Sequence, residues 1–170
     1  VFFIFYPPCR GFKESTLERV LGTDDHRENK NMLRHRTIRK PVYAIGIGVH
    51  TGDKVRMTLR PAGENTGITF VRSDVQSAAP IRAAAENVSD TTLSTSLGNA
   101  DVQVATVEHL MSALWGLGID NLIVELSSEE VPIMDGSAAP FVYLINTVGI
   151  VEQQALKQFV RIKREITVTQ

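Results

Sequence analysis

A short helical pattern at residues 105–111, ATVEHLM, constrains the fold most strongly. Its apolar positions follow the i, i+3, i+4, i+7 spacing of a helix that buries one face: Val107, Leu110, Met111 and Leu114. Because successive helical residues are rotated by about 100°, Glu108 and His109 point away from this stripe. The pattern predicts a helix over residues 107–115 that packs on a core and displays an adjacent carboxylate and imidazole.

The Glu108–His109 pair has a possible chemical role. Thr106 is expected to be the N-cap, which places the pair in the first helical turn. The helix dipole there favours an ionised Glu and disfavours a charged His. A neutral imidazole beside an ionised carboxylate suits a metal ligand next to a general base. A first-turn Glu is also common for dipole reasons alone, so the pair by itself leaves a solvent-facing, non-functional interpretation open.

Composition narrows the class of protein. The 170 residues suffice for one domain, and 43% hydrophobic with 22% charged residues is ordinary for a soluble globular protein. A net charge of -1 without a dense Lys/Arg block argues against binding to nucleic acid or anionic membranes. Cys9 is the single cysteine, which excludes an internal disulfide and a Cys-based zinc site. No stretch approaches the roughly 18 apolar residues of a membrane span. We expect a cytoplasmic protein.

Residues 1–31 differ from the rest of the chain. The opening VFFIFY lacks a basic region and ends at two prolines, which makes it a poor signal peptide. Residues 22–31 are polar and show no periodicity. We expect residues 1–31 to be a disordered or non-native extension, with Met32 as the true start. A genuine extension is the alternative.

The pattern becomes regular from about residue 36. Strands are expected at 37–47, 55–59, 68–72 and 121–126, with weaker candidates at 81–85 and 92–97. The first helix is expected to stop at the glycines of residues 116–118. Ser137 is expected to cap a second helix that ends at Gly149. Its apolar stripe is Phe141, Leu144, Ile145 and Val148. The fold class is therefore α+β, one sheet with two helices packed on one face, and a strand at 159–168 begins a new unit.

Two turns contain candidate functional residues. The glycine run at 46–52 lacks both the dinucleotide fingerprint and the Gly-Lys-Ser/Thr of a phosphate loop, which favours a hairpin turn with positive φ. His50 in this turn could be a ligand, a substrate contact or a structural residue, and we expect a structural or supporting role. Asp135 precedes the second helix, and an Asp beside Gly usually bonds the local backbone. We expect a supporting role there too.

Four motifs occur in an order that resembles a known family. They are VHTG at 49–52, ATVEHL at 105–110, GLGIDN at 116–121 and PIMDGSAAPFV at 132–142. Together they resemble the N-terminal domain of the UDP-3-O-acyl-N-acetylglucosamine deacetylases, which are zinc amidases of lipid A biosynthesis in Gram-negative bacteria. The resemblance covers about residues 32–168. Any one motif would be weak, whereas four in order are specific.

The resemblance implies an architecture and a reaction. The family has two similar domains, each a sheet with two helices, and the active site lies between them. Residues 32–157 would be the first domain, and residues 158–170 the first strand of the second. The family removes acetate from the amide nitrogen of a UDP-linked acylated amino sugar.

The resemblance also implies residue roles. His109 would be the zinc ligand of the first domain, and Glu108 would be the general base. Leu93 and Ser94 would line the mouth of the active site, although Ser94 stands where some members carry Cys.

One departure from the family pattern affects the expected activity. The family takes its other two Zn2+ ligands from a His-x-x-x-Asp motif in the second domain. The residues four positions after the histidines here are Lys30, Arg39, Lys54 and Ala113. A catalytic zinc normally has three protein ligands, and one is recognisable here. We therefore expect an incomplete half of the enzyme, inactive alone and binding zinc weakly, whose partner is the missing second domain. The alternative is a non-catalytic binding or structural domain.

Overall fold

The computed structural model describes residues 17–21, 33–99 and 101–162. Cys9, most of the expected N-terminal extension and residues 163–170 of the expected last strand lie outside the described residues. The fold is α+β, as the sequence predicts.

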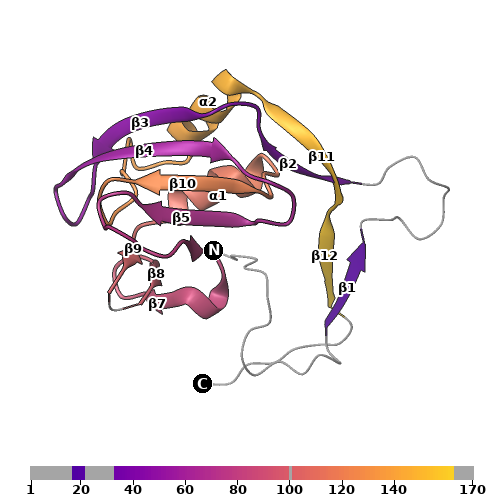
Figure 1. The fold of residues 1–170 in the computed structure, drawn as a ribbon, viewed down its shortest axis with the longest axis horizontal. Helices are drawn as coiled ribbons and strands as arrows, with labels where there is room; N and C mark the ends of the chain where they lie inside the picture. The colour runs from indigo at the N-terminus through magenta and orange to yellow at the C-terminus, as the bar shows by residue number, and fades with distance from the viewer. Residues whose placement is uncertain (1–16, 22–32, 100, 163–170) are drawn as a thin grey trace.

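A five-stranded mixed sheet forms the centre of the molecule (Figure 1). Its strand order is β3 (Val42–Ile47), β4 (Lys54–Pro61), β10 (Leu122–Leu126), β5 (Ile68–Arg72) and β6 (Ile81–Arg82). Only the β10–β5 pair is parallel, and the other pairs in this sheet are antiparallel. Val55, Met57 and Leu59 on β4 are fully buried while Arg56 and Arg60 are exposed. This alternation confirms the predicted half-buried strand, because side chains of a strand point alternately to its two faces.

Two helices pack on one face of this sheet, α1 (Glu108–Gly116) and α2 (Ala139–Val148). Their buried side chains belong to the same core cluster as those of the sheet: Leu110, Ala113 and Leu114 from α1, and Phe141, Ile145 and Val148 from α2. The predicted stripes are thus confirmed, with Met111 and Leu144 half-buried at their margins. Neither helix in the described part of the chain combines the length and apolar character needed to cross a membrane.

The helix ends follow local chemistry. The predicted stop of α2 is confirmed, because Gly149 takes φ 80°, a conformation that favours glycine. The prediction that Ser137 occupies the N-cap of α2 is wrong by one position, since Ala138 lies there. The Ser137 hydroxyl nevertheless accepts a hydrogen bond from the Ala139 amide at 3.1 Å.

Three smaller sheets, which the sequence did not predict, accompany the central one. They are β2 (Arg34–Ile38) with β11 (Ile150–Leu156), β7 (Val88–Asp90) with β8 (Ser96–Gly98) and β9 (Gln103–Val104), and β1 (Leu17–Leu21) with β12 (Gln158–Ile162). A 3-10 turn, Ala85–Asn87, precedes β7. The predicted strand at 37–47 is divided into β2 and β3, since the chain bends before Pro41, which has no amide to donate.

Strand β1 lies within the stretch expected to be disordered. Its residues pair antiparallel with β12 from Leu17↔Ile162 to Leu21↔Gln158. Residues 17–21 thus form a strand, and the expectation of a disordered or non-native extension over residues 1–31 stays a prediction. The remainder of residues 1–31 lies outside the described part of the chain.

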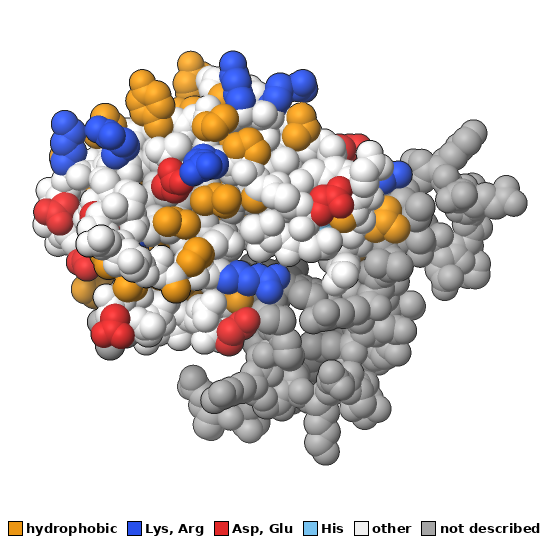
Figure 2. Space-filling model, viewed as in Figure 1, with side chains coloured by type: hydrophobic (Ala, Val, Ile, Leu, Met, Phe, Trp, Pro, Cys, Tyr) orange, Lys and Arg blue, Asp and Glu red, His pale blue; other side chains and the backbone are white. Residues whose placement is uncertain are grey.

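Side chains on the outside of the molecule are mixed in character. In Figure 2, hydrophobic side chains are interspersed with Lys, Arg, Asp and Glu on the face in view. Tyr43, Ile45 and Ile47 on β3 are exposed beside Arg56 on β4, which pairs with Ile45. The charged neighbours divide the apolar surface.

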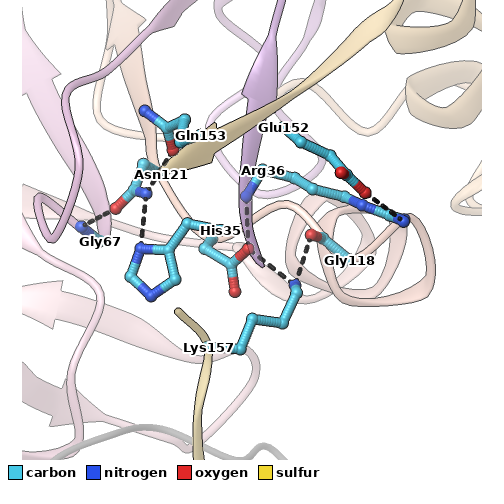
Figure 3. A network of polar contacts seen from close by, with 9 residues as sticks. His35, Arg36, Gly67, Gly118, Asn121, Glu152, Gln153 and Lys157 are labelled. Atoms are coloured by element: carbon cyan, nitrogen blue, oxygen red, sulfur yellow. Dashed lines mark hydrogen bonds and ion pairs between the residues drawn. The ribbon is translucent and has the colours of Figure 1, made fainter. Parts of the chain in front are cut away.

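A polar network joins β2, β11 and the turn after α1 (Figure 3). Asn121 is fully buried, and its side chain bonds the Gly67 amide at 2.9 Å, His35 Nδ1 at 3.1 Å and Gln153 Oε1 at 2.7 Å. In the same network, Asp120 accepts hydrogen bonds from the Arg36 amide and from Lys157 Nζ, both at 2.7 Å. The GLGIDN motif therefore anchors β11 and the residue that follows it, Lys157.

Replacing Asn121 tests this network. Asn121→Ala should lower the free energy of unfolding by about 2–3 kcal/mol, since it leaves buried partners without hydrogen bonds. Asn146→Ala, at an exposed position on α2, is the matched control and should change it by less than about 0.5 kcal/mol. Urea denaturation of the two variants measures the difference. Equal changes of the unfolding free energy in the two variants would mean that the hydrogen bonds of Asn121 add no stability beyond that of an exposed side chain.

Candidate functional site

The chain enters α1 through an unusual backbone conformation at Thr106. Ala105 forms a parallel bridge with Glu130, and Thr106 then takes φ 58°. A left-handed conformation at a β-branched residue costs on the order of 1–3 kcal/mol. The prediction that Thr106 is the N-cap is wrong. Val107 occupies that position without a side-chain cap, and the Thr106 hydroxyl instead donates to Glu130 Oε1 at 2.7 Å.

Glu108 is the first residue of α1 and is half-buried. Its Oε1 accepts a short hydrogen bond from the Thr95 amide. Thr95 directly follows Leu93 and Ser94, of which Leu93 is 80% exposed and Ser94 half-buried. The structure therefore brings the predicted general base next to the segment predicted to line the active site.

His109 has an unpaired ring nitrogen. Its Nδ1 is buried, and it is the single buried side-chain nitrogen or oxygen without a hydrogen-bond partner in the side chains described, those of residues 33–99 and 101–159. Leaving a buried polar atom unpaired costs about 1–3 kcal/mol, and such atoms are rare in folded proteins. An imidazole in this state, next to a carboxylate, is typical of a position that binds a ligand.

Asp135 lies in the turn before α2, near enough to His109 for their charges to interact. Its carboxylate accepts hydrogen bonds from the amide and the hydroxyl of Ser137, at 2.9 and 2.8 Å. The hydrogen bonds from Ser137 lower the pKa of Asp135, and the electrostatic interaction with His109 is a smaller lowering effect. Met134 beside it takes φ 56°, so a second non-glycine residue with a left-handed backbone borders the site.

Glu130 is a buried residue that the sequence analysis missed. It is 1% exposed, and its carboxylate accepts hydrogen bonds from three residues in two segments of the chain. The donors are the His50 amide at 3.1 and 3.2 Å, the Thr51 amide and hydroxyl at 3.1 Å, and the Thr106 hydroxyl at 2.7 Å. His50 therefore contributes through its backbone amide, and the residue itself is exposed.

The charge of Glu130 follows from these bonds. Burial raises the pKa of the carboxyl, but the hydrogen bonds from Thr106, Thr51 and His50 together lower the pKa below its ordinary value. Glu130 is thus a buried anion at neutral pH. In the sequence it stands beside Glu129 before an apolar stretch, and no periodicity distinguishes it from a surface acid.

The glycine turn at 46–52 encloses this carboxylate. A Cβ at Gly48 would lie 2.4 Å from both Glu130 Oε2 and Thr51 Oγ1, so a close approach rather than backbone φ requires glycine there. The positive φ predicted for this turn occurs at Gly52, φ 72°. The expected hairpin is confirmed as the β3–β4 connection.

The site supplies some but not all of the groups of a metal centre. Within the described residues, no group of three or more His, Cys, Asp or Glu side chains is placed to hold a metal ion. The unpaired nitrogen of His109 fits one ligand, and the neighbouring Glu108 fits a base. A complete catalytic zinc site would need further ligands.

A substitution at Gly48 tests the enclosure of Glu130. Gly48→Ala should lower the unfolding free energy by about 2 kcal/mol or more, because the added methyl group must displace the carboxylate from its donors. Gly63→Ala, where the nearest atom to a new Cβ is Thr66 Oγ1 at 3.7 Å, is the control and should be neutral or slightly stabilising. Thermal unfolding of both variants measures this. Equal melting temperatures would refute a tight fit around Glu130.

Comparison with known proteins gives a consistent result. A family model for UDP-3-O-acyl N-acetylglycosamine deacetylase matches residues 35–170. Proteins named UDP-3-O-acyl-N-acetylglucosamine deacetylase from Chromohalobacter salexigens, Teredinibacter turnerae and Marinobacter nauticus are 61%, 60% and 58% identical over 137 residues. These matches cover 81% of this chain and 45% of each relative, so the chain spans about half the length of the curated relatives it matches. The chain belongs to the UDP-3-O-acyl N-acetylglycosamine deacetylase family.

Proposed function

We propose that this chain is the N-terminal half of a zinc-dependent amidase of lipid A biosynthesis in a Gram-negative bacterium. The substrate is UDP-3-O-acyl-N-acetylglucosamine, and the reaction hydrolyses its N-acetyl amide. The observation that carries the proposal is the Glu108–His109 pair at the start of α1, with an unpaired buried nitrogen on His109. The family match and the names of the relatives support it.

His109 is proposed as a zinc ligand. The lack of a protein partner at Nδ1 supports this role, because the imidazole makes no competing hydrogen bond there. When bound, zinc supplies Lewis acidity, which polarises a carbonyl and lowers the pKa of water. The first turn of a helix packed on the core holds the imidazole in a fixed position, as such a site requires.

Glu108 is proposed as the general base. The Thr95 amide donates to Oε1, which stabilises the ionised carboxylate and fixes its orientation. This leaves Oε2 to accept the proton of the water that attacks the amide carbonyl. Protonated Glu108 can then pass this proton to the departing amine or to a neighbouring base.

Four further residues have proposed supporting roles. Leu93 and Ser94 line the substrate channel, and the exposed Leu93 offers apolar surface to it. His50 and Asp135 support the site, His50 through its amide on Glu130 and Asp135 through its charge near His109.

The remaining ligands and the proton donor to the amine are proposed to come from a second domain that starts near residue 158, with the whole enzyme in the cytoplasm. The relatives exceed the matched segment in length, which leaves room for such a domain. The competing possibility is a non-catalytic binding or structural domain. An incomplete ligand set among the described residues is compatible with both candidates, and the following experiment separates the two.

A chimera tests the two assignments separately. The matching 137-residue segment of the Chromohalobacter relative is replaced by that of this chain, and zinc content and deacetylase rate are measured. Glu108→Gln should lower the rate by on the order of 10²–10⁴ while zinc stays near one per chain, because a base is removed without a ligand. His109→Ala should lose zinc as well as rate.

The controls decide between the candidate functions. The isolated 170-residue chain should show no turnover. A chimera that folds and binds zinc but does not deacetylate would favour the non-catalytic alternative. Zinc loss in Glu108→Gln with zinc retained in His109→Ala would reverse the roles.

A further inference from the structure

We propose that Glu130 is the positioning residue of this site, a fixed buried anion that sets the entry of the chain into α1 and thereby orients Glu108 and His109. The orientation of Glu108 and His109 matters for catalysis only in the roles proposed above, and in this respect the proposal rests on the proposed function. The placement of Glu130 itself rests on geometry alone.

Glu130 connects its own segment, residues 129–131, to residues 105 and 106, which precede α1. Backbone hydrogen bonds hold residues 129–131 against Ala105, from the Ala105 amide to Glu129 O at 2.8 Å and from the Val131 amide to Ala105 O at 3.0 Å. Its carboxylate then reaches the next residue, Thr106, through the hydroxyl at 2.7 Å. Backbone and side chain together fix two consecutive residues immediately before the helix.

The bond to Thr106 falls on the residue with the strained backbone. Thr106 is 5% exposed and takes φ 58°, which β-branched residues rarely adopt. A hydrogen bond to an ionised acceptor is stronger than one between neutral groups. Glu130 therefore stabilises the conformation that turns the chain from the bridge at Ala105 into the helix.

A change of backbone angle at Thr106 acts directly on the predicted catalytic pair. Glu108 follows two residues later and His109 three residues later, with only Val107 between Thr106 and the helix. A rotation about φ of Thr106 would therefore change the orientation of the first turn of α1. The bond from the Thr95 amide to Glu108 reports that orientation, because it joins α1 to a separate loop.

The other side of Glu130 is held independently of α1. The amides of His50 and Thr51 and the Thr51 hydroxyl fix the carboxylate to the β3–β4 turn. Gly48 packs against Oε2 with no room for a side chain. The anion thus has a fixed position from which it restrains Thr106.

The experiment uses the intact 170-residue chain and its ¹H–¹⁵N spectrum. The Thr95 amide resonance reports the bond to Glu108, and Thr106→Val and Thr106→Ser form the matched pair. Thr106→Val keeps the shape and removes the hydroxyl, so the Thr95 resonance should move towards that of an amide without a carboxylate partner. Thr106→Ser keeps the hydroxyl and should restore the wild-type position. Glu130→Gln should shift Thr95 in the same direction as Thr106→Val.

Asp120→Asn controls for general destabilisation. Asp120 is also a partly buried carboxylate that accepts a backbone amide, but it lies beyond the other end of α1. Its replacement should lower the melting temperature and leave the Thr95 resonance unchanged. The proposal is overturned if folded Thr106→Val keeps the wild-type Thr95 resonance, if Thr106→Ser shifts as far as Thr106→Val, or if Asp120→Asn shifts Thr95 equally.

The same data separate this inference from the proposed function. If Thr95 responds as expected but the chimera described above fails to deacetylate, the proposed function fails and the positioning role stands. If the chimera is active and Thr95 does not respond, the positioning role fails alone.

Discussion

The arrangement of this site depends on one buried carboxylate. Burying the charge of Glu130 is unfavourable unless hydrogen bonds replace its hydration. Donors from the β3–β4 turn and from Thr106 supply them. The hydrogen bonds that compensate this charge therefore link segments far apart in sequence: His50 and Glu130 are separated by 80 positions. A neutral residue at position 130 would carry no buried charge that requires hydrogen bonds from the turn and from Thr106.

The two ends of α1 are held by different chemistry. Before its first residue, Glu130 and the bridge at Ala105 fix the entry of the chain. Beyond its last residue, the Asp120–Asn121 network fixes the turn that follows and attaches β11 (Figure 3). The apolar stripe between them adds burial, which is non-directional. Packing of the stripe sets which face of α1 meets the sheet. The polar anchors at both ends fix the entry and exit of the chain, and together these contacts give Glu108 and His109 a defined position.

Local patterns predicted the elements whose burial is periodic. The β4 alternation and the α1 stripe were found because one face of each meets the core. Strand β11 was missed because none of its residues is fully buried and its middle, EQQ at 152–154, is polar throughout. The short strands β7 and β9 offer too few residues for a pattern. In the site, Glu108 and His109 were recognisable from adjacent residues. Glu130 was not, because its partners are distant in sequence and an acid next to another acid resembles a solvated surface.

The sequence by itself determined the α+β class, the two helices with their buried faces, and the adjacent acid–imidazole pair, because each depends on residues within a few positions of one another. Tertiary structure decided the division of residues 37–47 into two strands, the pairing of β1 with β12, and the true role of Thr106. It also buried Nδ1 of His109 without a hydrogen-bond partner among the described side chains. These features follow from contacts between segments that are distant in sequence. A buried charge or amide needs a hydrogen-bond partner, and only the tertiary structure decides which group lies within hydrogen-bonding distance.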